Sequence, residues 1–360
     1  MTYRNYFPGS FTFVCGIAAA LCGAAMLLPG LASAQTLKDD LDLCTNTSAD
    51  LDRSISGCTA LIQSGQLDSN ANALSAIYSI RGTDYGLKGQ DDQAIQDFNQ
   101  AIQLNPNLAV AYKARGNAYL DKSDYQRAIQ DYDAAIRLDA NNDEAFTERA
   151  VVYSQDGQYD RAIQDCSEAI RLNPNSAKPY YMRGYAYYDK DDFDHAIQDF
   201  STAIRLNPND ADTFYHRGMA YGLNGDFDHA IQDFGQAIQL KPGDPDGWSQ
   251  RCLSRAIQDQ LDQALSDCNQ ALQLDPNDAD VLDHRGFAYL KMKKADAAIA
   301  DFNAALAGDA KRDFSLYGRG LAERLKGDRA AADADMAAAK AIDAKVVLVF
   351  RMWGVPTPQP

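Results

Sequence analysis

The sequence predicts an all-α fold, an α-solenoid built from eight helix–turn–helix repeats of 34 residues each. Charged residues give the first sign of the repeat, because an Arg recurs every 34 residues and an Asp follows each Arg after 16 residues. Two apolar patterns with helical spacing lie in each period, separated by turn-forming residues. An internal period of this length is typical of stacked repeats. The arginines are Arg81, Arg115, Arg149, Arg183, Arg217, Arg251, Arg285 and Arg319, and the aspartates are Asp97, Asp131, Asp165, Asp199, Asp233, Asp267, Asp301 and Asp335.

Each repeat is predicted to contain two helices, A and B, whose residues we number by their place in the repeat. In the second repeat, places 4, 8 and 11 share one face of helix A, and places 20, 24 and 27 share one face of helix B. These residues are Tyr112, Gly116 and Tyr119 on helix A, and Ala128, Tyr132 and Ala135 on helix B. The eight repeats are residues 75–108, 109–142, 143–176, 177–210, 211–244, 245–278, 279–312 and 313–346.

Turn residues separate the predicted helices. Place 15, between helices A and B, is Gly in half of the repeats, and Gly tolerates the left-handed conformation that ends many helices. These residues are Gly89, Gly157, Gly225 and Gly327. After helix B comes Asn-Pro-Asn or a variant of it, as at residues 173–175. Pro lacks the amide hydrogen that would continue the helix, and Asn or Asp can cap the next one.

Repeat length and residue types together resemble the tetratricopeptide repeat, a helix–turn–helix unit of the same length. In the fourth repeat, the positions typical of that family are Tyr180, Gly184, Tyr187, Ala196, Phe200, Ala203 and Pro208. The resemblance covers residues 75–346 and implies a right-handed superhelix. Three repeats depart from the pattern, and helix A of the sixth is expected to pack less regularly. The departures are Ala150 in the third repeat, Cys252 and Arg255 in the sixth, and Glu323 and Met336 in the eighth.

Both ends of the chain are predicted to lie outside the repeats. Residues 1–34 have the features of an export signal, because Arg4 precedes a long apolar stretch and Ala-Ser-Ala precedes a cleavage site. The length of the stretch leaves an uncleaved membrane anchor as the alternative. Residues 35–74 are expected to form an N-terminal helical cap, with a degenerate half-repeat at 48–64. Residues 347–360 are expected to extend the last helix over the final repeat and to end in a Pro-rich tail.

An exported protein, periplasmic or secreted, can keep disulfides. Cys44 and Cys58 flank a short loop and the start of a helix, and we predict that they pair. Cys252 and Cys268 lie in one repeat and either pair or remain buried thiols. Cys166 is predicted to be a core residue.

The recurring charges are predicted to form structural ion pairs. In an antiparallel hairpin that turns near place 15, the Arg at place 7 lies opposite the Asp at place 23. Arg115 is therefore expected to reach Asp131 or the Asp of a neighbouring repeat, and such pairs would select one register of stacking. The alternative is an Arg ladder that binds acidic ligands.

The resemblance implies that helix A lines a concave surface through places 2, 5, 9 and 12, and that a partner binds there. Tyrosines suit such a site, because they offer large contact area at low entropic cost. A carboxylate clamp known in the family is matched only in part, since Glu148 and Met182 stand where Asn and Arg are expected. The predicted partner-binding residues are Tyr181, Tyr185, Tyr188, Tyr215, Met219, Lys178, Lys113 and Asn117, and Asp212, Asp246, Asp280 and Asp283 favour basic partners.

Motifs and charge argue against catalysis and nucleic-acid binding. The sequence has no GxSxG, no Gly-rich phosphate loop and no HExxH, and its formal charge of −16 disfavours contact with phosphates. We expect no cofactor, no metal and, once the signal is removed, no membrane insertion. The predicted function is a non-catalytic scaffold that binds a peptide or helix of another protein in its concave groove. The alternatives are a structural or self-associating protein and an accessory module of an envelope enzyme complex.

Overall fold

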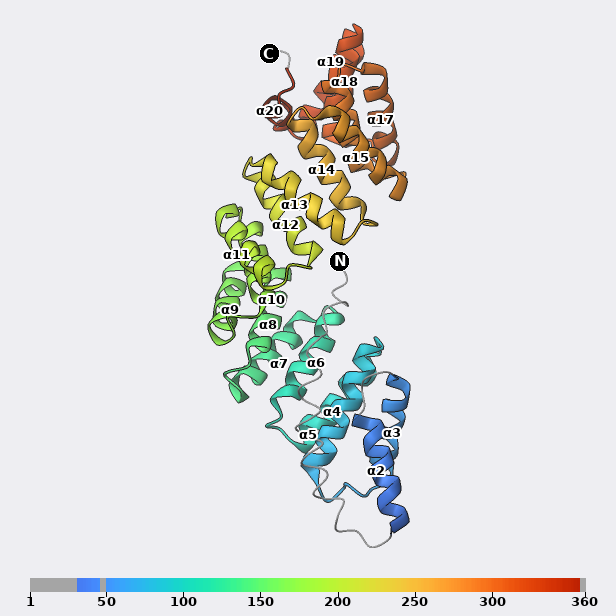
Figure 1. Ribbon diagram of the computed structural model, residues 1–360, viewed down its shortest axis with the longest axis vertical. Coiled ribbons are helices and arrows are strands. Elements are labelled where there is room, and N and C mark those ends of the chain that lie inside the picture. Colours follow the sequence, from blue (N-terminus) through green and yellow to red (C-terminus); the bar gives the residue numbers. More distant parts are fainter. Residues whose placement is uncertain (1–30, 46–49, 357–360) are drawn as a thin grey trace. The chain divides into compact units, whose positions relative to one another are not determined.

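The computed structural model describes residues 31–45 and 50–356, so the predicted signal sequence up to residue 30 and the last four residues of the tail lie outside the described residues. The described residues form 19 α-helices and no β-strand (Figure 1). The helices belong to two compact units, with α2–α9 in residues 1–175 and α10–α20 in residues 176–360. The predicted all-α class and helical repeat architecture are confirmed.

Sixteen helices form the eight repeats as antiparallel A–B pairs. Within each unit, every helix A packs against its own helix B and against both helices of the preceding repeat. Helices A are α4 (Ala71–Leu87), α6 (Ala109–Asp121), α8 (Asp143–Gln155), α10 (Ala177–Asp189), α12 (Ala211–Leu223), α14 (Pro245–Ile257), α16 (Ala279–Lys291) and α18 (Asp313–Lys326). Helices B are α5 (Asp91–Leu104), α7 (Tyr125–Leu138), α9 (Tyr159–Leu172), α11 (Phe193–Leu206), α13 (Phe227–Leu240), α15 (Leu261–Leu274), α17 (Ala295–Gly308) and α19 (Arg329–Ile342).

The turn between helices A and B has the same backbone conformation in all eight repeats. The four Gly residues at place 15 have φ between 71° and 93°. The four non-Gly residues there also have positive φ, between 57° and 60°. They are Ser123, Asp191, Asp259 and Lys293. The turn geometry is therefore a property of the hairpin, and Gly only lowers its conformational cost.

Helix B begins with a side-chain cap in half of the repeats. The residue at place 16 is Asp in these repeats, and its carboxylate accepts a hydrogen bond from the backbone N–H three residues later, as Asp124 does from Arg127 at 3.2 Å. The others are Asp192, Asp226 and Asp328. Such a cap satisfies one of the N–H groups that a helix start leaves without an intrahelical partner.

The core of each repeat is a close contact between helices A and B. The small residue at place 8 faces the large residue at place 24, so that a Cβ on Gly116 would lie 2.9 Å from Cε1 of Tyr132. A Cβ on Gly218 would lie 2.8 Å from Cε1 of Phe234. Both rings are fully buried. Gly is thus needed at place 8 wherever an aromatic ring fills place 24.

Two further helices precede the repeats. Helices α2 (Leu31–Thr45) and α3 (Leu51–Gln63) form a hairpin that packs on α4. Its core contains Leu37, Leu61 and the disulfide between Cys44 and Cys58, whose Sγ atoms are 2.05 Å apart. The predicted cleavage site after residue 34 falls inside α2. Helix α4 starts at Ala71, four residues before the first repeat as we delimited it.

The apolar segment after the last repeat does not continue α19. The chain leaves the helix at Asp343, whose backbone is extended, and residues Val346–Met352 form the separate helix α20. The ring of Phe350 lies 4.5 Å from that of Phe314 and 5.2 Å from that of Tyr317. These two partners occupy places 2 and 5 of the eighth repeat. The segment therefore folds back onto helix A instead of lengthening helix B.

Candidate functional site

The place-7 arginines and place-23 aspartates form a bidentate pair inside every repeat. Nε and Nη2 of each Arg donate to the two carboxylate oxygens of the Asp 16 residues later, at 2.6–2.8 Å. Seven of the aspartates are buried, and Asp335 in the last repeat is half-buried. Burial alone would lower the pKa of Arg149, but its hydrogen bonds to Asp165 and Asp133 outweigh burial and raise it. The pairs join helix A to helix B, as the sequence predicts.

The same arginines also reach the preceding repeat, which the sequence did not show. Nη1 of six arginines donates to the side chain at place 25 of the helix B before it, at 2.5–3.0 Å. The six acceptors are Thr59, Asn99, Asp133, Ser201, Asn269 and Asn303. Thr59 lies on α3, so the helix predicted as a degenerate half-repeat supplies this acceptor for the first repeat. Each of these arginines therefore connects three helices.

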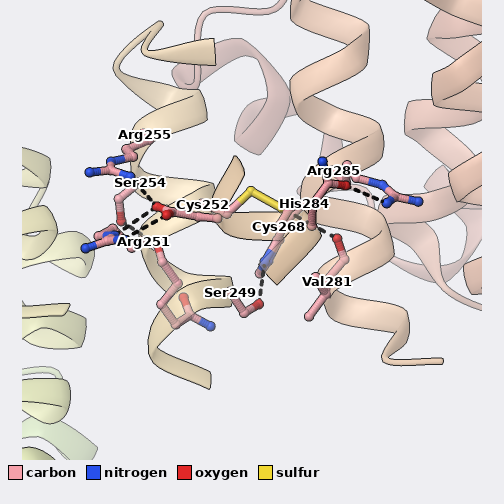
Figure 2. Close-up of a disulfide and its surroundings, with 12 residues drawn as sticks. Ser249, Arg251, Cys252, Ser254, Arg255, Cys268, Val281, His284 and Arg285 are labelled. Atoms are coloured by element: carbon pink, nitrogen blue, oxygen red, sulfur yellow. Dashed lines mark hydrogen bonds and ion pairs between the residues drawn. A yellow bond between two sulfur atoms is a disulfide. The ribbon is translucent and has the colours of Figure 1, made fainter. Parts of the chain in front are cut away.

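The sixth repeat replaces the contact between places 8 and 24 with a disulfide. Cys252 and Cys268 occupy these places, and their Sγ atoms are 2.00 Å apart (Figure 2). The sequence left open whether they pair. In the third repeat Ala150 faces the buried Cys166, which belongs to neither disulfide.

Four of the predicted partner-binding residues form one aromatic cluster around His216. The His216 ring lies 5.6 Å from that of Tyr181, 5.4 Å from that of Tyr185 and 5.3 Å from that of Tyr215. Tyr188 continues the cluster, with its ring 6.4 Å from that of Tyr185. The four tyrosines are half-buried and present their remaining surface on the helix-A face, meaning the side chains at places 2, 5, 9 and 12.

His216 is the residue of this cluster that sequence reasoning missed. Its Nδ1 lies 2.7 Å from the backbone oxygen of Asp212, and burial lowers its pKa. The imidazole is thus a neutral, packed ring that orients the surrounding tyrosines. Its position directly after Tyr215 was visible in the sequence, but the three-ring packing depends on the stacking of α12 on α10.

The acids of the helix-A face differ in how far they are neutralised. Lys241 donates to Asp212 at 2.6 Å, and Arg312 donates to Asp283 and contacts Asp280. No Lys or Arg in the described part of the chain forms a salt bridge with Asp246. Burial, together with nearby acids, raises the pKa of Asp246. Of the four acids predicted to favour basic partners, Asp246 has the least compensated charge.

The remaining predicted site residues are divided between the two compact units. Lys113 pairs with Glu144, and Asn117 accepts a hydrogen bond from the hydroxyl of Tyr132 at 2.7 Å. Both lie in the first unit, whereas Lys178 and Met219 lie in the second and are half-buried. Lys113 is thus engaged by the next repeat, and Asn117 by a residue of its own repeat.

Part of the helix-A face is covered by the chain itself. Phe350 and Trp353 lie 5.7 and 5.6 Å from the ring of Phe287, at place 9 of the seventh repeat. Trp353 also lies 5.8 Å from the ring of Phe314 in the eighth. The segment from α20 to Trp353 therefore occupies this face in the last two repeats. The four tyrosines of repeats four and five, which we call the tyrosine face, lie outside the part that this segment covers.

Neither a metal centre nor a membrane span is found in the part of the chain that the structure describes. No group of three or more His, Cys, Asp or Glu residues in this part is arranged to hold a metal ion. None of the described helices has both the length and the apolar composition needed to cross a bilayer.

Sequence models of one repeat family match the chain in several places. A model described as TPR repeat matches residues 82–123 and 184–225. Models described as tetratricopeptide repeat match residues 113–177, 211–244 and 279–310. Together the matched ranges cover just over half of the chain. No curated protein sequence matches it.

Solved structures show the same fold. A chain in the crystal structure of the APC/C hetero-tetramer Cut9–Hcn1 is 20% identical with a TM-score of 0.55, over 86% of this chain and 59% of that chain. The C-terminal part of a TPR repeat-containing protein from Cytophaga hutchinsonii is 23% identical with a TM-score of 0.53, over 66% and 98% of the two chains. PilF of Pseudomonas aeruginosa is 19% identical with a TM-score of 0.53, over 57% and 94%. The repeat length, the packing of helix pairs and the matched family models agree, and the chain belongs to the tetratricopeptide-repeat family of protein-interaction scaffolds.

Proposed function

We propose that this protein is a non-catalytic scaffold that binds a peptide or helix of a partner protein on the helix-A face of repeats four and five. The observation that supports the proposal is the cluster of Tyr181, Tyr185, Tyr188 and Tyr215, held in place by His216. Rings fixed in this way lose little entropy on binding, and half-buried tyrosines recur in the energetic centres of protein interfaces.

Charge around the cluster favours a partner segment with apolar and basic residues. Burial, followed by the negative charge of Asp246, raises the pKa of Tyr215, so its hydroxyl stays neutral and can donate a hydrogen bond. Asp246 lies in the first turn of the next helix A and has no cationic partner among the described residues. A Lys or Arg of the partner would compensate this carboxylate, while apolar side chains cover the tyrosine rings.

We also propose that the protein is exported to an oxidising compartment. Two pairs of cysteines are at disulfide distance, and disulfides persist mainly outside the cytosol. Alkylation of the protein in freshly lysed cells under denaturing conditions, which expose the buried Cys166, followed by mass measurement, tests this. Four of the five cysteines after residue 34 should resist alkylation until a reductant is added.

Affinity capture of partner proteins tests the binding site. Residues 31–360 are used as the bait, because this fragment keeps α2 whole. A captured partner is then titrated against the wild type and against the triple variant Tyr181→Ala, Tyr185→Ala, Tyr215→Ala. We expect the triple variant to bind at least about 10-fold more weakly, since each central ring of an interface is worth about 1–2 kcal/mol or more.

Two tyrosines at the start of helix B serve as the matched control. Tyr125→Ala and Tyr159→Ala remove rings of the same kind at place 17, away from the helix-A face. Their affinity for the partner should equal that of the wild type. A partner held equally well by the triple variant, with circular dichroism showing an intact fold, would remove the proposed site.

A further inference from the structure

The sixth repeat contains one arginine whose contact with the preceding repeat is missing. Arg251 pairs with Asp267 through Nε and Nη2, as in every other repeat. Place 25 of the preceding helix B, which supplies the acceptor for Nη1 elsewhere, is Gly235. Among the residues that the structure describes, Nη1 of Arg251 has no hydrogen-bond acceptor. A donor that is bonded in six other repeats is therefore left open here.

The same repeat carries a second guanidinium. Arg255 stands at place 11, where most repeats have an aromatic residue, and its Nη1 donates to Asp267 at 2.6 Å. Nε of Arg255 is buried and has no partner in the described part of the chain. Two arginines thus share one carboxylate, which leaves a net positive charge at this point of an acidic protein. Figure 2 shows both guanidinium groups on the side of α14 that faces away from the disulfide.

The open position has room for an acceptor. A Cβ built on Gly235 would lie 3.5 Å from Nη1 of Arg251, which is an ordinary contact distance, and no other atom outside its own helix turn would come within 4 Å. The side chains of Arg251 and Arg255 are 15% and 19% exposed, so solvent reaches the pair. The absence of a side chain at Gly235 therefore leaves an accessible site beside two donors.

The third repeat shows which group fits such a site. There the acceptor at place 25 is a carboxylate, and Nη1 of Arg149 donates to Oδ1 of Asp133 at 2.5 Å while Arg149 keeps its bidentate pair with Asp165. One guanidinium of this ladder can thus hold two carboxylates at once. In the sixth repeat the second carboxylate is not supplied by the chain.

We propose that Arg251, Arg255 and Gly235 form a binding site for a carboxylate of another molecule, which takes the place that Asp133 fills in the third repeat. The ligand is an acidic side chain or the C-terminal carboxylate of a peptide. Charge-assisted hydrogen bonds from a guanidinium to a carboxylate are among the stronger polar contacts in proteins. The site is distinct from the tyrosine face and does not depend on it.

Acetate tests the carboxylate chemistry directly. The melting temperature of the protein is measured in sodium acetate and in sodium chloride at equal ionic strength and pH 7. We expect a saturable rise of about 1–3 °C that acetate causes and chloride does not. NMR signals of the Arg251 guanidinium should shift over the same range of acetate concentration. An equal effect of the two salts on both measurements would overturn the proposal.

Two variants show where acetate binds. Asn269 accepts the Nη1 hydrogen bond of Arg285 in the next repeat. Gly235→Asn should supply the same acceptor to Arg251, so this variant should lose the acetate effect. Ser201→Ala removes the acceptor of Arg217, now bonded at 3.0 Å, and should create a second acetate-responsive position. Each variant is compared with itself in the two salts, because both substitutions also change basal stability. An undiminished acetate effect in Gly235→Asn would place the ion elsewhere and refute the site.

Two peptides distinguish the sources of the carboxylate. One has a single internal Glu and an amidated C-terminus, and the other has no acidic residue and a free C-terminus. If either peptide competes with acetate in the wild type and this competition is lost in Gly235→Asn, the result supports the site and identifies its ligand. Failure of both peptides at concentrations where acetate binds would restrict the site to small ions and contradict a peptide ligand.

Discussion

Arg183 and its counterparts illustrate how one side chain can fix the packing of several helices. The guanidinium has five N–H donors in a rigid plane, and two of them fit the two oxygens of a buried Asp. In six repeats another donor reaches the preceding helix B. Buried ion pairs add little net stability, since desolvation offsets much of the attraction. Loss of one partner is costly, however, because it leaves the other charge buried and uncompensated.

Arg183→Ala should therefore lower stability strongly. It leaves Asp199, which is only 5% exposed, without its cation, and we expect a loss of about 3–5 kcal/mol in the free energy of unfolding. Urea unfolding of the wild type and the variant measures this. Arg205→Ala removes an exposed Arg of α11 and should change stability by less than about 0.5 kcal/mol. If the Arg183→Ala protein were as stable as the wild type but no longer bound its partner protein, the result would instead support the alternative in which the arginines bind acidic ligands.

Asp84 carries a buried charge with no cationic partner among the described residues. It accepts a hydrogen bond from Oγ of Ser54 at 2.5 Å, while its Oδ1 has no partner in the described structure. Burial raises the pKa of Asp84 to about 6, although the bond from Ser54 lowers it somewhat. Because the pKa is higher in the folded than in the unfolded chain, this group favours folding below about pH 4 and loses that contribution as pH rises through about 6.

Asp84→Asn should consequently stabilise the protein at pH 7.5 by up to about 2–3 kcal/mol and change little at pH 4. Denaturant unfolding at the two pH values gives the difference directly. Asp42→Asn, at an exposed position of α2, is the control and should show no comparable pH dependence. A variant of Asp84 that is equally or less stable at pH 7.5 would mean that the carboxylate is compensated in solution.

At the scale of the helix pair, one contact decides how helices A and B meet. Places 8 and 24 hold Gly and an aromatic ring in most repeats, and the disulfide between Cys252 and Cys268 in the sixth. In the N-terminal hairpin, Cys58 aligns with place 24 and bonds to Cys44 on the preceding helix. In both cases a covalent bond joins the residue at place 24 to the preceding helix, where most repeats have ring packing. In the third repeat, place 24 is Cys166 but place 8 is Ala150, so only one of the two cysteines needed for such a disulfide is present.

Ala150→Cys should complete a third disulfide, to Cys166. The two residues occupy the same places as Cys252 and Cys268, whose Cα atoms are 5.4 Å apart, and Cα distances of this size suit a disulfide. A closed loop of this length is expected to stabilise the protein by up to about 3 kcal/mol. Thiol titration should find no free thiol at either position, and a reductant should abolish the gain. Val151→Cys, one residue further along α8, should leave Cys166 reactive once the protein is unfolded.

At the scale of the whole chain, the described repeats begin and end with different capping devices. The hairpin of α2 and α3 covers the first repeat and is closed by a disulfide. The segment from α20 to Trp353 covers the last two repeats with Phe350, which is fully buried, and with Trp353. Terminal repeats need such covers because one of their faces has no neighbouring repeat to bury it.

Phe350→Ala should uncover the last two repeats. Truncation of a fully buried Phe typically costs about 3–5 kcal/mol, and here it also frees the rings of Phe314 and Tyr317. We expect earlier loss of protection for amides of α18 and α19 in hydrogen exchange, with protection of α4–α7 unchanged. Leu348→Ala, at a residue of the same helix that is 54% exposed, should have little effect. Equal protection in both variants would show that α20 is not a cap.

Periodicity was sufficient to predict the repeats and the pairing of place 7 with place 23, because residue identity is kept at these places. Periodicity was not sufficient at places where the repeats share the same backbone or side-chain geometry but have different residue types. The acceptor at place 25 is Thr, Asn, Asp or Ser, so its shared role appears only when helices are stacked. The left-handed turn residue Lys293 gives no sequence signal either. The apolar segment packs on the final repeat as predicted, but the prediction that it lengthens the last helix was wrong, because apolar character indicates burial without showing which face is covered.

The contacts of Nη1 run in one direction along the chain. In the six repeats where they are seen, an Arg reaches the helix B synthesised before it. Its bidentate Asp follows only 16 residues later. A chain that emerges N-terminus first, from the ribosome or from an export channel, can therefore complete all three polar links of one Arg before the next repeat has emerged. Each repeat would then be completed in turn on the one before it, without any repeat waiting for a later one.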